Sequence, residues 1–115
     1  MAKNYHDVTG NIVEYIKQLK PAIPGTMKGF YDMAGAATAD GVLDKKTKEY
    51  VALAIGVSTR CDGCIGFHTK ALVELGATRE EVAEVLGMAI YMGGGPSLMY
   101  AADALRAYDQ FSQKG

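Results

Sequence analysis

The spacing of apolar and polar residues is helical along nearly the whole chain. Ile12, Ile16 and Leu19 recur at intervals of four and three residues, which predicts an amphipathic helix over residues 7–20. Pro21 is expected to end this helix because it has no amide hydrogen to donate. No stretch alternates apolar and polar residues with the period of two that a half-buried strand requires. The pattern therefore predicts an all-α fold.

Two further helices are expected before the middle of the chain. Pro24 opens a weaker helix, and Asp-Gly at residues 40–41 predicts the turn that follows it. Asp44 is a suitable N-cap for the next helix, in which residues 51–57 are apolar on all sides. Such a run is typical of a helix buried on every side, although a buried strand gives the same signal. We favour a helix because the preceding chain shows no strand pattern.

The second half of the chain predicts three more helices. The first runs from about Cys61 to Leu75 and is followed by Gly76 as a C-cap residue. A capping box at residues 78–81 opens the next helix, and Gly-Gly-Gly-Pro at residues 93–96 separates it from the last one. The predicted architecture is a compact bundle of about six helices. The last helix is expected to bury one stripe of residues: Leu98, Ala101, Ala102, Leu105 and Tyr108.

Composition and charge narrow the class of protein. The chain has 115 residues, of which 49% are apolar and 22% charged, and we expect one domain over residues 1–115. A formal net charge of −1 favours neither nucleic acid nor an anionic membrane as a partner. No apolar run approaches the ~20 residues needed to span a bilayer, and the first ten residues lack a signal-peptide pattern. These features predict a cytoplasmic protein, in which a lone Cys-x-x-Cys pair favours catalysis or metal binding over a structural disulfide.

The residues best suited to chemistry lie between positions 49 and 68. Cys61 and Cys64 stand near a predicted helix N-terminus, where unpaired backbone N–H groups favour a thiolate. His68 follows Cys64 by one helical turn on the same face, and Glu49 of the preceding helix is placed to orient it and accept its proton. One sulfur would be oxidised to a sulfenic acid and the other would condense with it to a disulfide. We assign the attack to Cys64, which is nearer His68, and the resolving role to Cys61.

This spacing resembles the signature of the AhpD-like alkylhydroperoxidases of the carboxymuconolactone decarboxylase superfamily. The matching residues are Glu49, the Cys61-Asp-Gly-Cys64 segment and His68, and the resemblance extends over residues 30–108. It implies an all-helical fold, no cofactor, and a thiol-dependent peroxidase that acts on small hydroperoxides. It also implies a peroxidatic Cys64, a resolving Cys61 and a Glu49–His68 proton relay. The reductant would be a dithiol, such as a lipoyl or thioredoxin-type protein, and the assembly a homo-trimer or homo-hexamer.

One departure from the family pattern and three alternatives stay open. The best-studied members carry a second histidine where this chain has Gly63, so a simpler relay and lower rates are expected. Members that act as decarboxylases generally lack the paired cysteines, which disfavours that activity here. Cys61, Cys64 and His68 would offer three zinc ligands, but their crowding on one helix face suits a tetrahedral site poorly. A redox-sensing role of the same fold is the third alternative.

Methionine and tyrosine residues near the C-terminal end recur at helical spacing. We interpret them as core or subunit-interface residues rather than as a ligand site, and a small chain with this much apolar surface is expected to self-associate. These residues are Met88, Tyr91, Met92, Met99 and Tyr100.

Overall fold

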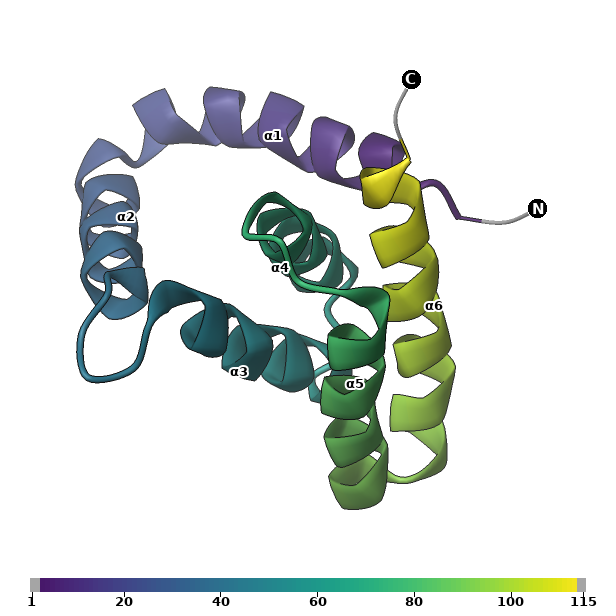
Figure 1. The fold of residues 1–115 in the computed structure, drawn as a ribbon. Coiled ribbons are helices and arrows are strands. Elements are labelled where there is room, and N and C mark those ends of the chain that lie inside the picture. Colours follow the sequence, from purple (N-terminus) through teal and green to yellow (C-terminus); the bar gives the residue numbers. More distant parts are fainter. Residues whose placement is uncertain (1–2, 114–115) are drawn as a thin grey trace.

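The computed structural model describes residues 3–113, which form six helices and no strand (Figure 1). The all-α prediction is therefore confirmed. Over the same residues, none of the helices is both long and apolar enough to cross a membrane. The helices are α1 (Tyr5–Ala22), α2 (Pro24–Thr38), α3 (Lys45–Ser58), α4 (Asp62–Glu74), α5 (Arg79–Gly93) and α6 (Gly95–Ser112).

Helix α4 lies at the centre of the arrangement. It packs against α3, α6 and α1, while α5 and α6 form an antiparallel pair whose joined ends project away from the other helices (Figure 1). Among the described helices, α2 contacts only α1 and α3, and none of its residues is buried. Ile65 and Leu72 of α4 are fully buried with Leu53 and Val57 of α3. Each such side chain contributes roughly 1.5–3 kcal/mol through removal from water.

The break between α1 and α2 differs from the prediction. Pro21 does not end the first helix but lies inside its last turn, and α1 continues to Ala22. The chain leaves the helical conformation at Ile23, where φ is −138° and ψ is 63°. Ile23 precedes Pro24, whose ring disfavours helical geometry in the residue before it. Pro24 therefore sets the angle between the first two helices.

The predicted caps are confirmed. The Asp44 side chain accepts a hydrogen bond from the Thr47 amide at 2.8 Å and so begins α3. Thr78 and Glu81 form the reciprocal capping box that begins α5. Gly76 after α4 has a φ of 82°, a left-handed conformation that glycine adopts with little strain.

Two burial predictions are wrong. Helix α3 is not buried on every side, because Val51 is 50% and Ile55 is 57% exposed. Its other face packs against α4 and α5, and Val51 and Ile55 lie on the side that stays half exposed. In α6 the predicted stripe is wrong in part: Ala101 is buried and Leu105 and Tyr108 pack against the core, but Leu98 is 47% exposed and Ala102 is exposed. The buried residues of α6 all have small side chains, which allow close packing: the predicted Ala101, and also Ser97, Ala104 and Ala107.

Candidate active site

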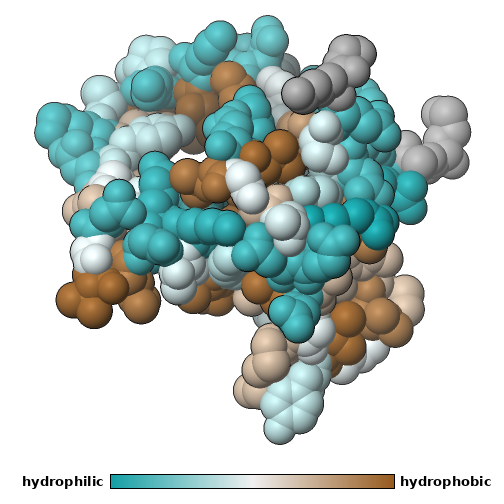
Figure 2. Space-filling view, in the orientation of Figure 1, coloured by the Kyte–Doolittle hydropathy of each residue, from teal (hydrophilic) through white to brown (hydrophobic). Residues whose placement is uncertain are grey.

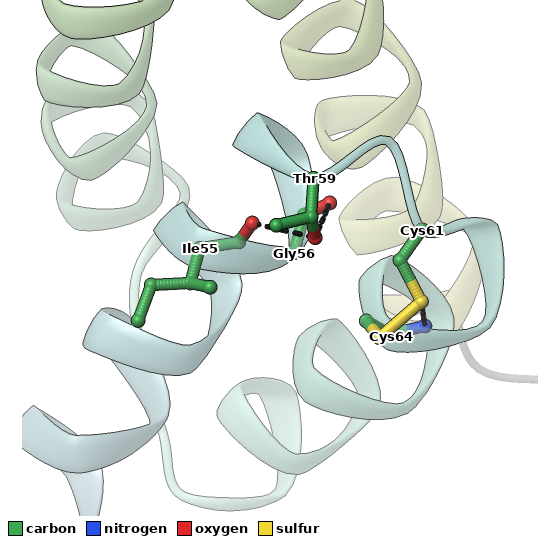
Figure 3. The surroundings of a disulfide bond; sticks show 5 residues. All are labelled: Ile55, Gly56, Thr59, Cys61 and Cys64. Atoms are coloured by element: carbon green, nitrogen blue, oxygen red, sulfur yellow. Dashed lines mark hydrogen bonds between the residues drawn. A yellow bond between two sulfur atoms is a disulfide. The ribbon is translucent and has the colours of Figure 1, made fainter.

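The two cysteines form a disulfide in the first turn of α4 (Figure 3). Cys61 is the N-cap residue of α4, its sulfur accepts a hydrogen bond from the Cys64 amide at 3.1 Å, and the two Cα atoms lie 5.2 Å apart. A sulfur thus occupies the position that a Ser or Asp oxygen holds in most helix caps. Because backbone N–H groups point toward it, this end of the helix favours a negatively charged sulfur after reduction.

A tight turn between α3 and α4 places Cys61. Arg60 has a φ of 58°, and the Cys61 amide donates to the Gly56 carbonyl at 3.0 Å. The Thr59 hydroxyl donates to the Ile55 carbonyl at 2.9 Å and so closes the end of α3 (Figure 3). A left-handed conformation costs a non-glycine residue roughly 1–2 kcal/mol. The surrounding hydrogen bonds hold the turn despite this cost, and Cys61 directly follows it.

Helix α3 approaches α4 closely at the second cysteine. A Cβ atom placed on Gly56 would lie 2.9 Å from the Cβ atom of Cys64, closer than two such carbons normally come. Gly56 is therefore required for this approach. Gly56 is not among the predicted site residues, although a glycine inside the apolar run of residues 51–57 was the signal that could have identified it.

Glu49 and His68 form a hydrogen-bonded pair between α3 and α4. Oε2 of Glu49 lies 2.6 Å from Nδ1 of His68. The Glu49 side chain is only 6% exposed, whereas that of His68 is 30% exposed. A buried carboxylate is costly without a partner, and His68 supplies that partner. Within residues 3–113, Nε2 of His68 has no hydrogen-bond partner, so this nitrogen is free to exchange a proton with another group.

The structure thus brings the four predicted site residues to one interface. On antiparallel α3 and α4, Glu49 faces His68, and Gly56 faces Cys64. Cys64 and His68 lie four residues apart on α4, which places them on one face of the helix. The carboxylate does not face solvent, and the imidazole lies one turn from the disulfide.

Helix α1 covers another face of the same first turns of α4. A Cβ atom on Gly63 would lie 2.8 Å from Cδ1 of Ile12, and one on Gly66 would lie 2.6 Å from Cγ2 of Thr9. At Gly63, the end of the Ile12 side chain occupies the space beside the backbone. A side chain at position 63 would therefore require the end of Ile12 to move aside.

An ion-pair cluster that the sequence analysis missed lies beside Cys61. Lys3 Nζ contacts Asp62 at 3.1 Å and Asp103 at 3.0 Å, and hydrogen bonds to Asp103 and Asp62 raise the pKa of Lys3. Burial raises the pKa of the nearby Tyr5 hydroxyl to about 12. Lys3 partly offsets the negative charge of Asp62, which would otherwise oppose a thiolate at the adjacent cysteines. No sequence pattern links residue 3 to residue 62.

In the disulfide state, the described residues of the site lack an arrangement of side chains that could bind a metal ion. Within the part of the chain that the structure describes, no group of three or more His, Cys, Asp or Glu side chains is arranged to hold one. The thiolate form of cysteine is the metal ligand, and here both sulfurs are joined in the disulfide.

Comparisons with known proteins define the class. Residues 24–107 match the model of the carboxymuconolactone decarboxylase family, and the chain belongs to that family. It is similar to a carboxymuconolactone decarboxylase family protein from Legionella pneumophila, with 54% identity, a TM-score of 0.93, and coverage of 95% of this chain and 97% of that one.

Two relatives extend the comparison. An uncharacterized protein of Cupriavidus necator is 46% identical over 91 residues, which is 79% of this chain and 80% of that protein. The alkyl hydroperoxide reductase AhpD of Mycobacteroides abscessus is 35% identical over 63 residues, which is 55% of this chain and 36% of that protein. The predicted resemblance to AhpD-like proteins of this family is confirmed.

Proposed function

We propose that this protein is a thiol-dependent peroxidase that reduces small alkyl hydroperoxides, with Cys61 and Cys64 cycling between dithiol and disulfide. The observation that carries the proposal is the pairing of a buried Glu49 with His68, one turn along α4 from a cysteine pair at the helix N-terminus. The similarity to an alkyl hydroperoxide reductase supports the same chemistry. The cytosol, where dithiol reductants are maintained, is the compartment that we propose for it.

The first half-reaction oxidises Cys64. Its thiol gives a proton to Nε2 of His68, and the thiolate attacks the terminal oxygen of the hydroperoxide. A sulfur–oxygen bond forms as the oxygen–oxygen bond breaks, so two electrons pass from sulfur to the peroxide. The departing alkoxide takes the proton from His68 and leaves as an alcohol. Cys64 is left as a sulfenic acid.

The second half-reaction closes the disulfide. Cys61 attacks the sulfur of the Cys64 sulfenic acid, so that a sulfur–sulfur bond forms and the sulfur–oxygen bond breaks. The departing hydroxide receives the proton lost by Cys61 and leaves as water. An external dithiol then restores both thiols by exchange, with attack beginning at Cys61. We propose a lipoyl or thioredoxin-type protein as this reductant.

Glu49 acts in this scheme by holding His68. Its contact with Nδ1 fixes the ring orientation and stabilises the imidazolium that forms when Nε2 accepts the thiol proton. Proton transfer by a positioned side chain contributes roughly a hundredfold to ten-thousandfold to a rate. Glu49 is therefore a positioning residue, whereas Cys64, Cys61 and His68 touch the reacting atoms.

Steady-state turnover with a panel of dithiol reductants tests the proposal. Wild type should consume hydroperoxide with at least one reductant, and Cys64→Ser should not. Cys61→Ser is the matched control, because it keeps the attacking sulfur and should react with one equivalent of hydroperoxide without further cycles. A wild-type protein that is inactive with every reductant overturns the proposal.

The family name supports one second candidate, a carboxymuconolactone decarboxylase-like reaction that needs no thiol. Alkylation of both reduced cysteines separates the two functions. Decarboxylation of a lactone substrate should survive that treatment, whereas peroxide reduction should be lost.

We also propose that the protein forms a homo-trimer or homo-hexamer through the projecting α5–α6 pair. Residues 85–102 contain no charged side chain, while Tyr91 is 78% and Met92 is 76% exposed. Hydrophobic residues gather on this projecting end (Figure 2). The exposed residues Met88, Tyr91, Met92, Leu98 and Met99 present roughly 600 Å² on a scale of ~200 Å² per large side chain.

The exposed face of α3 continues this surface. An apolar pocket joins Ile55 of α3 to Met88 and Met92 of α5. With Val51 and Ile55 included, the surface approaches the ~800 Å² per partner of a stable interface. An uncharged surface of this size suits a second copy of itself. Light scattering should give a trimer or hexamer for wild type and for Glu84→Lys, but a smaller species for Tyr91→Lys; a monomeric wild type contradicts the proposal.

A further inference from the structure

A cavity is lined by residues of α1, α2 and α4. Figure 1 shows how these three helices are arranged. The surface is visibly hollowed there (Figure 2). Its volume of about 330 Å³ falls within the ~300–1,000 Å³ of small-molecule sites. Its lining residues are Val13, Ile16, Lys17, Lys20, Tyr31 and Phe67.

The cavity is one helical turn from the candidate active site. Phe67 of its wall precedes His68 and follows Cys64 by three residues on α4. On the facing helix, Ile16 follows Ile12 by four residues, and Ile12 is the residue that lies against Gly63. The cavity therefore lies one helical turn, about 5 Å, along α1 and α4 from the first turn of α4, which carries the cysteines.

The lining combines an apolar wall with positive charge. Four of the six residues are aliphatic or aromatic, the other two are Lys17 and Lys20, and no acidic residue is among the described residues that line it. Nζ of Lys20 lies 5.3 Å from the ring centre of Tyr31, so this ammonium group is held between α1 and α2. An apolar chain that ends in an anion complements such a lining.

We propose that this cavity binds a medium-chain carboxylate, with its hydrocarbon against Ile16 and Phe67 and its carboxylate at Lys17 and Lys20. Because the proposal rests on the peroxidase function above, it assigns the substrate class as hydroperoxides of amphipathic carboxylic acids, such as fatty-acid hydroperoxides. The chain would then run along α4, and the peroxide group would reach the turn that carries Cys64.

Calorimetric titration with decanoate and decanol tests the binding site without any turnover. The disulfide form of wild type should bind decanoate about tenfold more tightly than decanol, because a charge-assisted hydrogen bond distinguishes the two ligands. Lys20→Glu should weaken decanoate binding at least about tenfold and leave decanol binding little changed. Circular dichroism would check that each variant keeps its helices.

Lys45→Glu is the matched control. Lys45 is exposed in the first turn of α3 and does not line the cavity, so this charge reversal should leave decanoate binding as in wild type. Three results overturn the inference: no binding to wild type, as when another copy of the chain fills the cavity; equal affinity for decanoate and decanol; or the same loss in Lys45→Glu as in Lys20→Glu. Tight decanoate binding by a protein that reduces no hydroperoxide would overturn the peroxidase function instead.

Discussion

The two faces of α4 that α3 and α1 cover differ in the contacts that hold the covering helix. Helix α3 meets one face through Gly56 and contributes the buried Glu49 to His68. Helix α1 meets another face through Gly63 and leaves a cavity beside Phe67. Both helices come close because α3 or α4 carries a glycine at the contact. Only the α3 face places a charged group out of water.

The α3 face therefore serves to position His68, whereas the α1 face is suited to binding a ligand. A carboxylate as buried as Glu49 depends on its partner, so the geometry around His68 tolerates little change. The lysines at the α1 face stay exposed to solvent and can adjust to a ligand. We therefore expect substitutions at the α3 face to affect the rate of chemistry most, and substitutions at the α1 face to affect packing or ligand affinity.

The largest effect is expected from Glu49→Gln. The amide keeps the shape and a hydrogen bond to His68 but cannot stabilise an imidazolium, so peroxide turnover should fall roughly a hundredfold or more. The pH dependence of turnover should change as well, since the charge beside His68 is lost. Glu74→Gln, at the exposed end of α4, is the control and should behave as wild type. If Glu49→Gln keeps the turnover and the pH profile of wild type, the α3 face does not affect the rate of chemistry more than the α1 face does.

A smaller effect, on stability, is expected at the α1 face. Gly63→His places a side chain against the flexible end of Ile12, which must move aside, and should destabilise the fold by about 1 kcal/mol and lower Tm by a few degrees. Ile12→Ala combined with Gly63→His should recover part of that loss. Thermal unfolding would give the Tm of wild type, of Gly63→His and of the double variant.

Gly29→Ala is the control for that series. Nothing lies within 4 Å of a Cβ atom added at Gly29 on α2, so alanine there should stabilise by about 0.5–1 kcal/mol. A Gly63→His protein as stable as wild type would show that α1 does not press on α4 as the structure describes.

The smallest effect is expected at Glu81, which lies away from both faces of α4 and contributes to the pH dependence of stability. Hydrogen bonding from the Thr78 amide, followed by that from Lys46, lowers the pKa of Glu81 to about 2. In the unfolded chain the glutamate pKa is near ~4.3, so the unfolded state binds a proton at Glu81 more readily than the folded state does. The contribution of Glu81 to the free energy of unfolding is therefore complete above that pH and is lost toward pH 2. Glu81→Gln should therefore lose less stability than wild type on acidification from about pH 5 to 2.

The control for acidification is Glu84→Gln, one turn along α5, whose side chain makes no hydrogen bond within the described residues. Urea unfolding at several pH values measures each protein. If Glu81→Gln and Glu84→Gln follow the same pH dependence, the capping box is not the source of the effect.

The sequence predicted the local features of this fold better than its tertiary ones. The caps at Asp44 and Thr78 were predictable because each depends on residues within one turn. The exposure of Val51 and Ile55 was not, because it depends on which helices lie beside α3. Pro21 was misjudged because the conformation of Ile23, before the next proline, decides where α1 ends.

The candidate site shows the same limit. Spacing alone nominated Glu49 and His68, and their contact follows from the antiparallel packing of two consecutive helices. Neither the need for glycine at Gly56 nor the Lys3 ion pairs could be predicted, since both join residues through tertiary packing. The cavity at Phe67 was also beyond prediction, because it depends on the angle between α1 and α2.

The most direct test of the central claim is the stoichiometry of one oxidation. Fully reduced protein would be mixed with one equivalent of an alkyl hydroperoxide, and the thiols and the peptide that joins Cys61 to Cys64 would be followed by mass spectrometry. We predict the loss of two thiols and the formation of one alcohol per peroxide, with Cys61 and Cys64 joined as the product. Both thiols remaining free while the peroxide persists would contradict the account.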